Sequence, residues 1–73
     1  MNKLLRISGR QCVDALQKVG FVFRRQNHYH TVLRRNNPFT QIVVPNHNQL
    51  DRGVPRAILR QADINIEKFI SLL

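Results

Sequence analysis

The chain has 73 residues and a formal net charge of +8, with 12 Lys and Arg against 4 Asp and Glu. This length allows one domain, expected over residues 1–73, and a hydrophobic content of 42% is too high for a disordered basic tail. The single cysteine excludes an intrachain disulfide and favours a reducing, cytoplasmic compartment. No apolar run approaches the ~20 residues of a membrane-spanning helix, and Met1–Arg6 lacks the pattern of a signal peptide.

The first element predicted along the chain is a helix over residues 9–18. Ser8 is a typical N-cap residue, and Val13 and Leu16 recur at helical spacing after it. Gly20 then fits the end of the helix, where a left-handed residue is common.

The pattern next changes to the period of two that is typical of strands. It predicts strands over residues 21–25, 28–34 and 39–44, separated by Gln26-Asn27 and by the strong turn signal Asn36-Asn37-Pro38. Three strands joined by short turns predict an antiparallel meander.

Two helical segments follow the strands. Gly53-Val54-Pro55 opens a second helix, Asp63 ends it, and Asn65 caps a short terminal helix. The predicted fold class is α+β: an α-β-β-β-α sandwich of two layers, with the helices on one face of the sheet and a short extra C-terminal helix.

Carboxylates are scarce, which limits the chemistry available to the chain. The four are Asp14, Asp51, Asp63 and Glu67, and none lies between positions 14 and 51. Glycosidase-type acid pairs and two-metal nuclease sites both need clustered carboxylates. Catalysis would therefore use His, Arg, Lys, Tyr or Ser, and we expect no cofactor.

The basic residues form sets that favour binding of a polyanion over a merely solvated surface, because arginine forks match phosphate oxygens. The candidate RNA-binding residues are Arg24, Arg25, Arg35, Arg52, Arg56 and Arg60. Arg34 falls two positions beyond Val32 on the same predicted strand, on the face that residue 30 also occupies.

Three histidines, His28, His30 and His47, are the candidate proton carriers. His28 and His30 are two apart on a predicted strand, so we expect them on one face. Together with Cys12 the three could formally bind zinc, but the spacing resembles no zinc motif and Cys12 belongs to an apolar helix stripe, so no metal site is expected. RNA suits this inventory, because its 2′-hydroxyl can attack the adjacent phosphate with only a base or acid and nearby cations to assist.

The ordered set of motifs resembles the HicA toxins of type II toxin–antitoxin systems. The matching segments are Ser8-Gly9-Arg10, Leu16, Gly20-Phe21, Arg25-Gln26, His30-Thr31-Val32-Leu33-Arg34-Arg35, Val44-Pro45-Asn46-His47, Leu50-Asp51-Arg52-Gly53, Arg56-Ala57-Ile58-Leu59-Arg60-Gln61-Ala62 and Glu67-Lys68-Phe69.

The resemblance implies a fold like a double-stranded-RNA-binding domain and a growth-arresting endoribonuclease that cleaves mRNA. It places the catalytic histidine at His30, after a family Gly-Ser pair that this chain replaces with His28-Tyr29. His28, Arg34 and His47 are the possible supporting residues. It also implies a HicB-like antitoxin that covers the His30 region, with operator DNA bound only through the toxin–antitoxin complex.

Two alternatives remain open at this point. The basic surface alone would support a non-catalytic RNA-binding module, because phosphate contacts do not depend on sequence. The lost Gly-Ser pair would fit a degenerate toxin that acts only as a protein partner.

Overall fold

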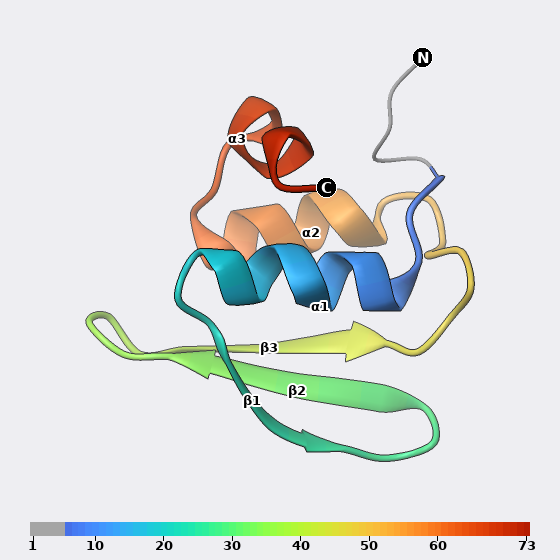
Figure 1. Ribbon diagram of the computed structural model, residues 1–73, viewed down its shortest axis with the longest axis horizontal. Coiled ribbons are helices and arrows are strands. Elements are labelled where there is room, and N and C mark those ends of the chain that lie inside the picture. Colours follow the sequence, from blue (N-terminus) through green and yellow to red (C-terminus); the bar gives the residue numbers. More distant parts are fainter. Residues whose placement is uncertain (1–5) are drawn as a thin grey trace.

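The computed structural model describes residues 6–73; Met1–Leu5, most of the segment expected not to be a signal peptide, lie outside the described residues. The elements are α1 (Gly9–Lys18), β1 (Val22–Gln26), β2 (His30–Arg35), β3 (Thr40–Pro45), α2 (Val54–Ala62) and α3 (Ile66–Ser71). Figure 1 shows the helices on one side of the sheet, with α1 and α2 next to it and α3 on their far side, and the helix and strand order confirms the predicted α+β class.

Helix α1 has the bounds that the sequence predicts. The Gln11 amide donates to Ser8 Oγ at 3.0 Å, and the Ser8 amide donates to Gln11 Oε1 at 2.8 Å, so both form a capping box. Gly20 follows the helix at a φ of +97°, a conformation that glycine adopts at little cost. The helix turns Cys12 and Leu16 into the core.

The sheet is an antiparallel meander in the order β1-β2-β3, as predicted. The strand bounds differ by up to two residues from the expected ones, most clearly in β2, which begins at His30. His28 therefore lies in the β1–β2 turn, and the expectation that it shares a strand face with His30 is wrong. Between Phe23 and Arg25 the register shifts, which marks a β-bulge in β1.

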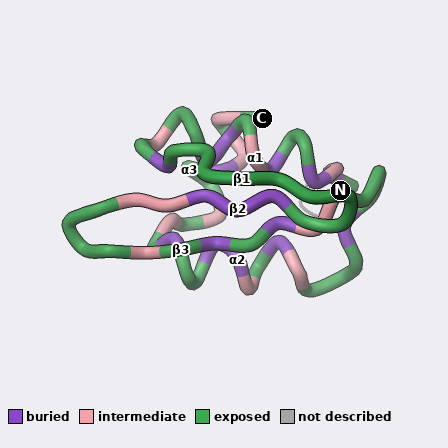
Figure 2. The backbone as a smooth tube through the Cα atoms, turned by 90° about the horizontal axis from the view of Figure 1, so that it is seen from below, coloured by how far each residue is buried: buried purple, intermediate pink, exposed green. Residues whose placement is uncertain are grey.

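The core lies between the helices and one face of the sheet. Leu33, Ile42 and Val44 are each 0% exposed on that face, whereas Val43 on the other face is 45% exposed. Figure 2, which views the molecule from the sheet side, shows buried and exposed positions alternating along β3, whereas β1 is exposed along its whole length. Burial of each large core side chain contributes roughly 1.5–3 kcal/mol. The sheet therefore has a covered face and a face that no described helix covers, which we call the open face.

The C-terminal helices close the helical layer. Asp63 ends α2 in the left-handed conformation, and the Lys68 amide donates to Asn65 Oδ1 at 2.7 Å as the cap of α3. Lys18 Nζ donates to the Leu72 carbonyl at 2.9 Å, which ties the end of α1 to the end of α3. Over residues 6–73, the helices are too short and too polar to cross a membrane.

Candidate functional site

His30, the predicted catalytic residue, is exposed at the first position of β2, and its Cα pairs with that of Pro45 on β3. Side chains alternate along a strand, so His30 and Arg34 share one face while Thr31 and Leu33 occupy the other. Leu33 belongs to the core under the helices, which places His30 on the open face. The sequence left this choice of face undecided, because both alternating sets of β2 contain apolar residues.

The backbone of His30 is fixed by one neighbour, Asn27. The His30 amide donates to Asn27 Oδ1 at 2.8 Å, and the Asn27 amide donates to the His30 carbonyl at 2.9 Å. Asn27 Oδ1 also accepts from the Tyr29 amide at 2.8 Å. The asparagine side chain thus builds the turn from which β2 starts, as Asn does in many turns.

A second asparagine, Asn46, fastens this turn to the rest of the fold. Its Oδ1 accepts from Thr31 Oγ1 at 2.7 Å, its Nδ2 donates to the Asn27 carbonyl at 2.9 Å, and its amide donates to the Tyr29 carbonyl at 2.8 Å. Thr31 is only 4% exposed, so its hydroxyl needs such a partner. Neither asparagine was identified from the sequence as part of the site. The turn tendency of Asn27 was a usable signal, whereas the reach of Asn46 across 15 residues was not.

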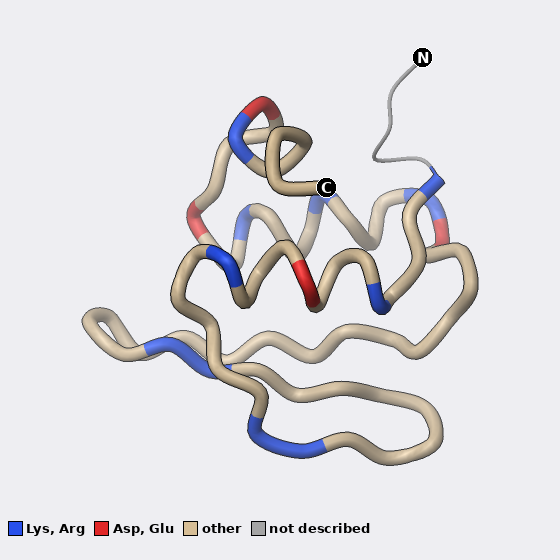
Figure 3. The backbone as a smooth tube through the Cα atoms, in the orientation of Figure 1, with Lys and Arg blue, Asp and Glu red and all other residues tan. Residues whose placement is uncertain are grey.

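Two arginines share the open face with His30. Arg25 pairs with Val32 across the sheet, and Arg34 Nε donates to Gln41 Oε1 on β3 at 2.7 Å. All four carboxylates of the chain lie outside the strands, in the helical layer and its loops (Figure 3). The open face is therefore positively charged around the exposed His30, and Arg24 adds an exposed charge at the bulge of β1.

The other two histidines have different surroundings. The His28 ring packs edge-on against the Tyr29 ring, with centroids 4.8 Å apart. His47 follows β3, where its carbonyl accepts from the Gly9 amide at 2.9 Å, and it lines a groove on the helix side. No hydrogen bond within residues 6–73 joins either imidazole to His30.

The part of the chain that the structure describes contains no cluster of metal-ligating side chains. Within the described range 6–73, no three His, Cys, Asp or Glu side chains are grouped closely enough to hold an ion. Cys12 is 0% exposed in the core, where burial raises the pKa of its thiol to about 12. A thiol that stays protonated in this way is a poor metal ligand.

Arg35 points inward rather than toward solvent. Its Nη1 donates to the carbonyl of Ala62 at 3.2 Å, its guanidinium carbon lies 4.6 Å from the centre of the Phe21 ring, and its Nε is buried. Arg35 thus satisfies a free carbonyl at the end of α2 and packs over an aromatic ring. Because its guanidinium makes these contacts inside the protein, Arg35 is not a free cation on the open face as the predicted RNA-binding arginines were expected to be.

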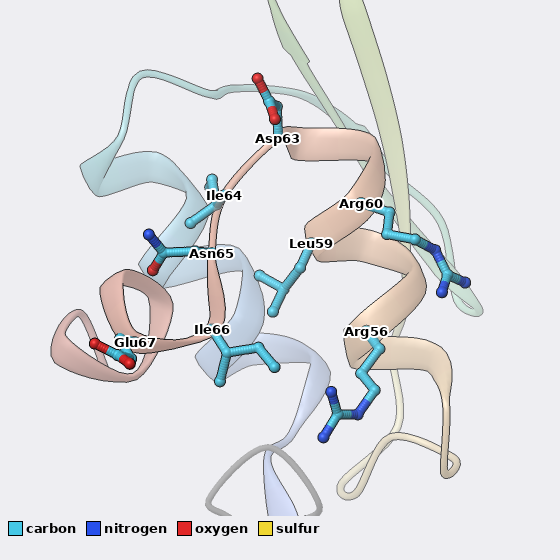
Figure 4. Close-up of a pocket in the computed structure, with 8 residues that line it drawn as sticks. All are labelled: Arg56, Leu59, Arg60, Asp63, Ile64, Asn65, Ile66 and Glu67. Atoms are coloured by element: carbon cyan, nitrogen blue, oxygen red, sulfur yellow. The ribbon is translucent and has the colours of Figure 1, made fainter.

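The remaining arginine candidates belong to the helical layer. Arg52 precedes α2, and Arg56 and Arg60 lie on α2 at the edge of an open cleft of about 740 Å³. Figure 4 shows these two arginines on α2 and Glu67 on α3 across the cleft, which is lined by Arg56, Leu59, Arg60, Asp63, Ile64, Asn65, Ile66 and Glu67. The carboxylates of Asp63 and Glu67 lie in this cleft with the two arginines, so it carries charges of both signs. The structure therefore separates the arginines into a sheet set and a helix set.

The structure is thus a basic α+β sandwich that presents a histidine and arginines on one open sheet face. A family model described as "HicA toxin of bacterial toxin-antitoxin" matches residues 9–64, and the chain belongs to this family. Its partner is accordingly an antitoxin. A search of curated proteins finds no match.

Proposed function

We propose that the protein is a metal-independent endoribonuclease that cleaves mRNA, with His30 as general acid or base. The observation that carries the proposal is the position of His30. Its side chain is exposed on the open face, while Asn27 holds its backbone by accepting from the His30 amide and donating to the His30 carbonyl. A side chain that starts from a fixed backbone loses little freedom when it meets a substrate.

The chemistry draws its nucleophile from RNA. A base removes the proton of the 2′-hydroxyl, the 2′-oxygen forms a bond to the adjacent phosphorus, and the bond from phosphorus to the 5′-oxygen breaks. An acid protonates the leaving 5′-oxygen. The products are a 2′,3′-cyclic phosphate and a 5′-hydroxyl. His30 performs one of these proton transfers, and solvent, to which the imidazole is open, supplies the other.

The arginines near His30 would stabilise the charge that develops on the phosphate. Arg25 and Arg34 lie on the same face, and Arg24 is exposed beside them. Cations aimed at a transferring phosphoryl group contribute strongly to such reactions. Arg52, Arg56 and Arg60 would bind the RNA backbone outside the reacting centre, whereas the internal contacts of Arg35 assign it to the fold.

The regulation follows from the same surface. In this proposal a HicB-like antitoxin covers the His30 region and keeps the toxin silent in the cytoplasm, and the free toxin arrests growth by cutting mRNA. An acidic partner surface would complement the net charge of +8. The complex would bind operator DNA through the antitoxin.

The test is incubation of purified protein with a single-stranded mRNA fragment in excess EDTA, with analysis of the new RNA ends. Cleavage that leaves a 2′,3′-cyclic phosphate supports the proposal. Loss of cleavage in EDTA contradicts it. Binding without cleavage, in EDTA or in Mg²⁺, indicates a non-catalytic RNA-binding module, and a protein that neither binds RNA nor arrests growth acts only as a partner.

A further inference from the structure

A groove of about 500 Å³ lies on the helix side of the sheet, between α1 and the edge strand β1. We call it the α1–β1 groove, and it is lined by Ser8, Arg10, Val13, Asp14, Gln17, Phe23, Gln26, Thr31, Asn46, His47 and Asn48. The α1 positions 10, 13, 14 and 17 are one stripe of the helix. The volume lies within the range of sites that hold small organic groups.

Phe23 makes this groove unusual. Its Cα pairs with that of Leu33, so it belongs to the covered face, yet its side chain remains 44% exposed while that of Leu33 is 0% exposed. β1 is an edge strand, and α1 leaves a space above this position. An aromatic ring open to a groove is the platform on which RNA-binding proteins stack unpaired bases.

The rim provides groups that match the edge of a base. Gln17, Gln26 and Asn48 are exposed amides, each able to donate and to accept. The Asp14 carboxylate accepts N–H donors and repels phosphate, which favours a base over an anion inside the groove. Arg10, exposed at the rim, is placed to meet a phosphate just outside it.

Two residues that line the groove, Thr31 and Asn46, also connect it to the turn that carries His30. Thr31 follows His30 in β2 and points to the opposite face, where it and Asn46 line the groove. The same two side chains are hydrogen-bonded to each other and, through Asn46, to the turn that carries His30. An RNA strand that passes around the β1–β2 turn would contact both faces of the sheet at the end where β2 begins.

We propose that the α1–β1 groove binds an unpaired base of the RNA substrate, stacked on Phe23, next to the phosphate that meets His30. This inference rests on the proposed function and adds to it a subsite that selects single-stranded RNA. Bases in a duplex are already stacked on their neighbours and cannot enter.

The experiment uses fluorescence, since the chain has no tryptophan. Phe23→Trp places one indole in the groove, and Phe39→Trp is the matched control, because Phe39 is 66% exposed in the β2–β3 turn outside the groove. Both are made in a His30→Ala background, so that RNA stays intact. Each is titrated with a single-stranded RNA and with a duplex of the same sequence, and labelled RNA reports binding independently.

Quenching of the indole in Phe23→Trp by the single strand, absent with the duplex and in Phe39→Trp, supports the proposal. Should Phe23→Trp fail to fold, Phe23→Ala must weaken single-strand binding about 5- to 150-fold and leave duplex binding unchanged. RNA binding without quenching of the Phe23→Trp indole overturns the proposal that the groove binds a base, and leaves the proposed function standing. An indole that responds only to an acidic partner protein makes the groove a protein interface and also overturns it.

Two further results separate this inference from the proposed function. RNA binding by none of the proteins overturns both. Cleavage that persists in the His30→Ala protein, together with specific quenching in Phe23→Trp, overturns the role of His30 and leaves the subsite standing.

Discussion

Gly9, the first residue of α1, lies directly against the carbonyl group of Pro45 at the end of β3. A Cβ atom on Gly9 would collide with that oxygen, and the neighbouring backbone cannot move aside as a flexible side chain can. The Gly9 amide also donates to the His47 carbonyl at 2.9 Å. The contact sets how closely the helical layer approaches the end of the sheet where β2 begins.

Gly9→Ala should destabilise the protein by about 1–3 kcal/mol, because the helix must move away from Pro45. The sign of the change in unfolding free energy tests the contact, because alanine in an unobstructed helix is more favourable than glycine by about 1 kcal/mol. Urea unfolding followed by circular dichroism measures the difference. Gln17→Ala, at an exposed position of the same helix, should stay within about 0.5 kcal/mol of the parent. A more stable Gly9→Ala protein would contradict the close contact.

His30→Ala should lower the rate of RNA cleavage by about 10²- to 10⁴-fold, the usual contribution of a general acid or base. The imidazole is exposed, so the unfolding free energy should change by less than about 0.5 kcal/mol. His28→Ala is the matched variant, and we expect a loss below about tenfold, because its ring packs on Tyr29 in the turn. Equal losses in the two variants would mean that the catalytic histidine is wrongly assigned.

Asn46→Ala should cost about 1–3 kcal/mol of unfolding free energy, since the buried Thr31 hydroxyl loses its acceptor. Asn46→Asp keeps an acceptor for Thr31 but sets a carboxylate oxygen against the Asn27 carbonyl in place of the Nδ2 donor, so it should also destabilise the protein. Faster hydrogen exchange at the His30 amide, measured by NMR, would show that the turn has loosened. Asn36→Ala, in the exposed β2–β3 turn, is the control and should leave that exchange rate unchanged.

The Cys12 thiol should resist thiol reagents at pH 8 until the protein unfolds, because it is fully buried and its pKa is raised to about 12. The raised pKa also predicts a pH dependence. The unfolded thiol ionises above its ordinary value of 9.0 while the folded one keeps its proton. Stability is therefore lost as the pH rises above 9, at about 1.4 kcal/mol per unit from this group. Unfolding of Cys12→Ala at pH 8 to 11 should show a shallower decline; an equal decline would contradict the assignment.

The sequence predicted most of the fold because its local signals agree with the final packing. Ser8, the apolar spacing and Gly20 specify α1 with its observed bounds, and Asn65 caps α3 as expected. β2 was predicted two residues too early because His28 and Tyr29 favour strands by residue type. The Asn27 side chain instead accepts hydrogen bonds from the Tyr29 and His30 amides, and these bonds form a turn.

The candidate site was only partly predictable, because its geometry depends on contacts between distant segments. Arg34 and Arg35 are neighbours with the same side chain, yet one bonds Gln41 on the open face and the other bonds the Ala62 carbonyl. The second contact joins residues 27 positions apart and exists only once α2 has docked. Patterns within one strand do not contain that information, nor the link from Asn46 to Thr31.

The alternation of covered and open positions along β2 lets mutation act on two properties independently. Substitutions at the buried Thr31 and Leu33 should change how much toxin is folded, whereas under the proposed function those at His30 and Arg34 should change what the folded toxin does. A collection of survivors selected for loss of toxicity would therefore fall into two groups, one at the buried positions Thr31, Val32 and Leu33 and one at His30 and Arg34. Survivors of the first group regain toxicity in the cold or at higher expression, and those of the second group remain harmless under every condition while still titrating the antitoxin.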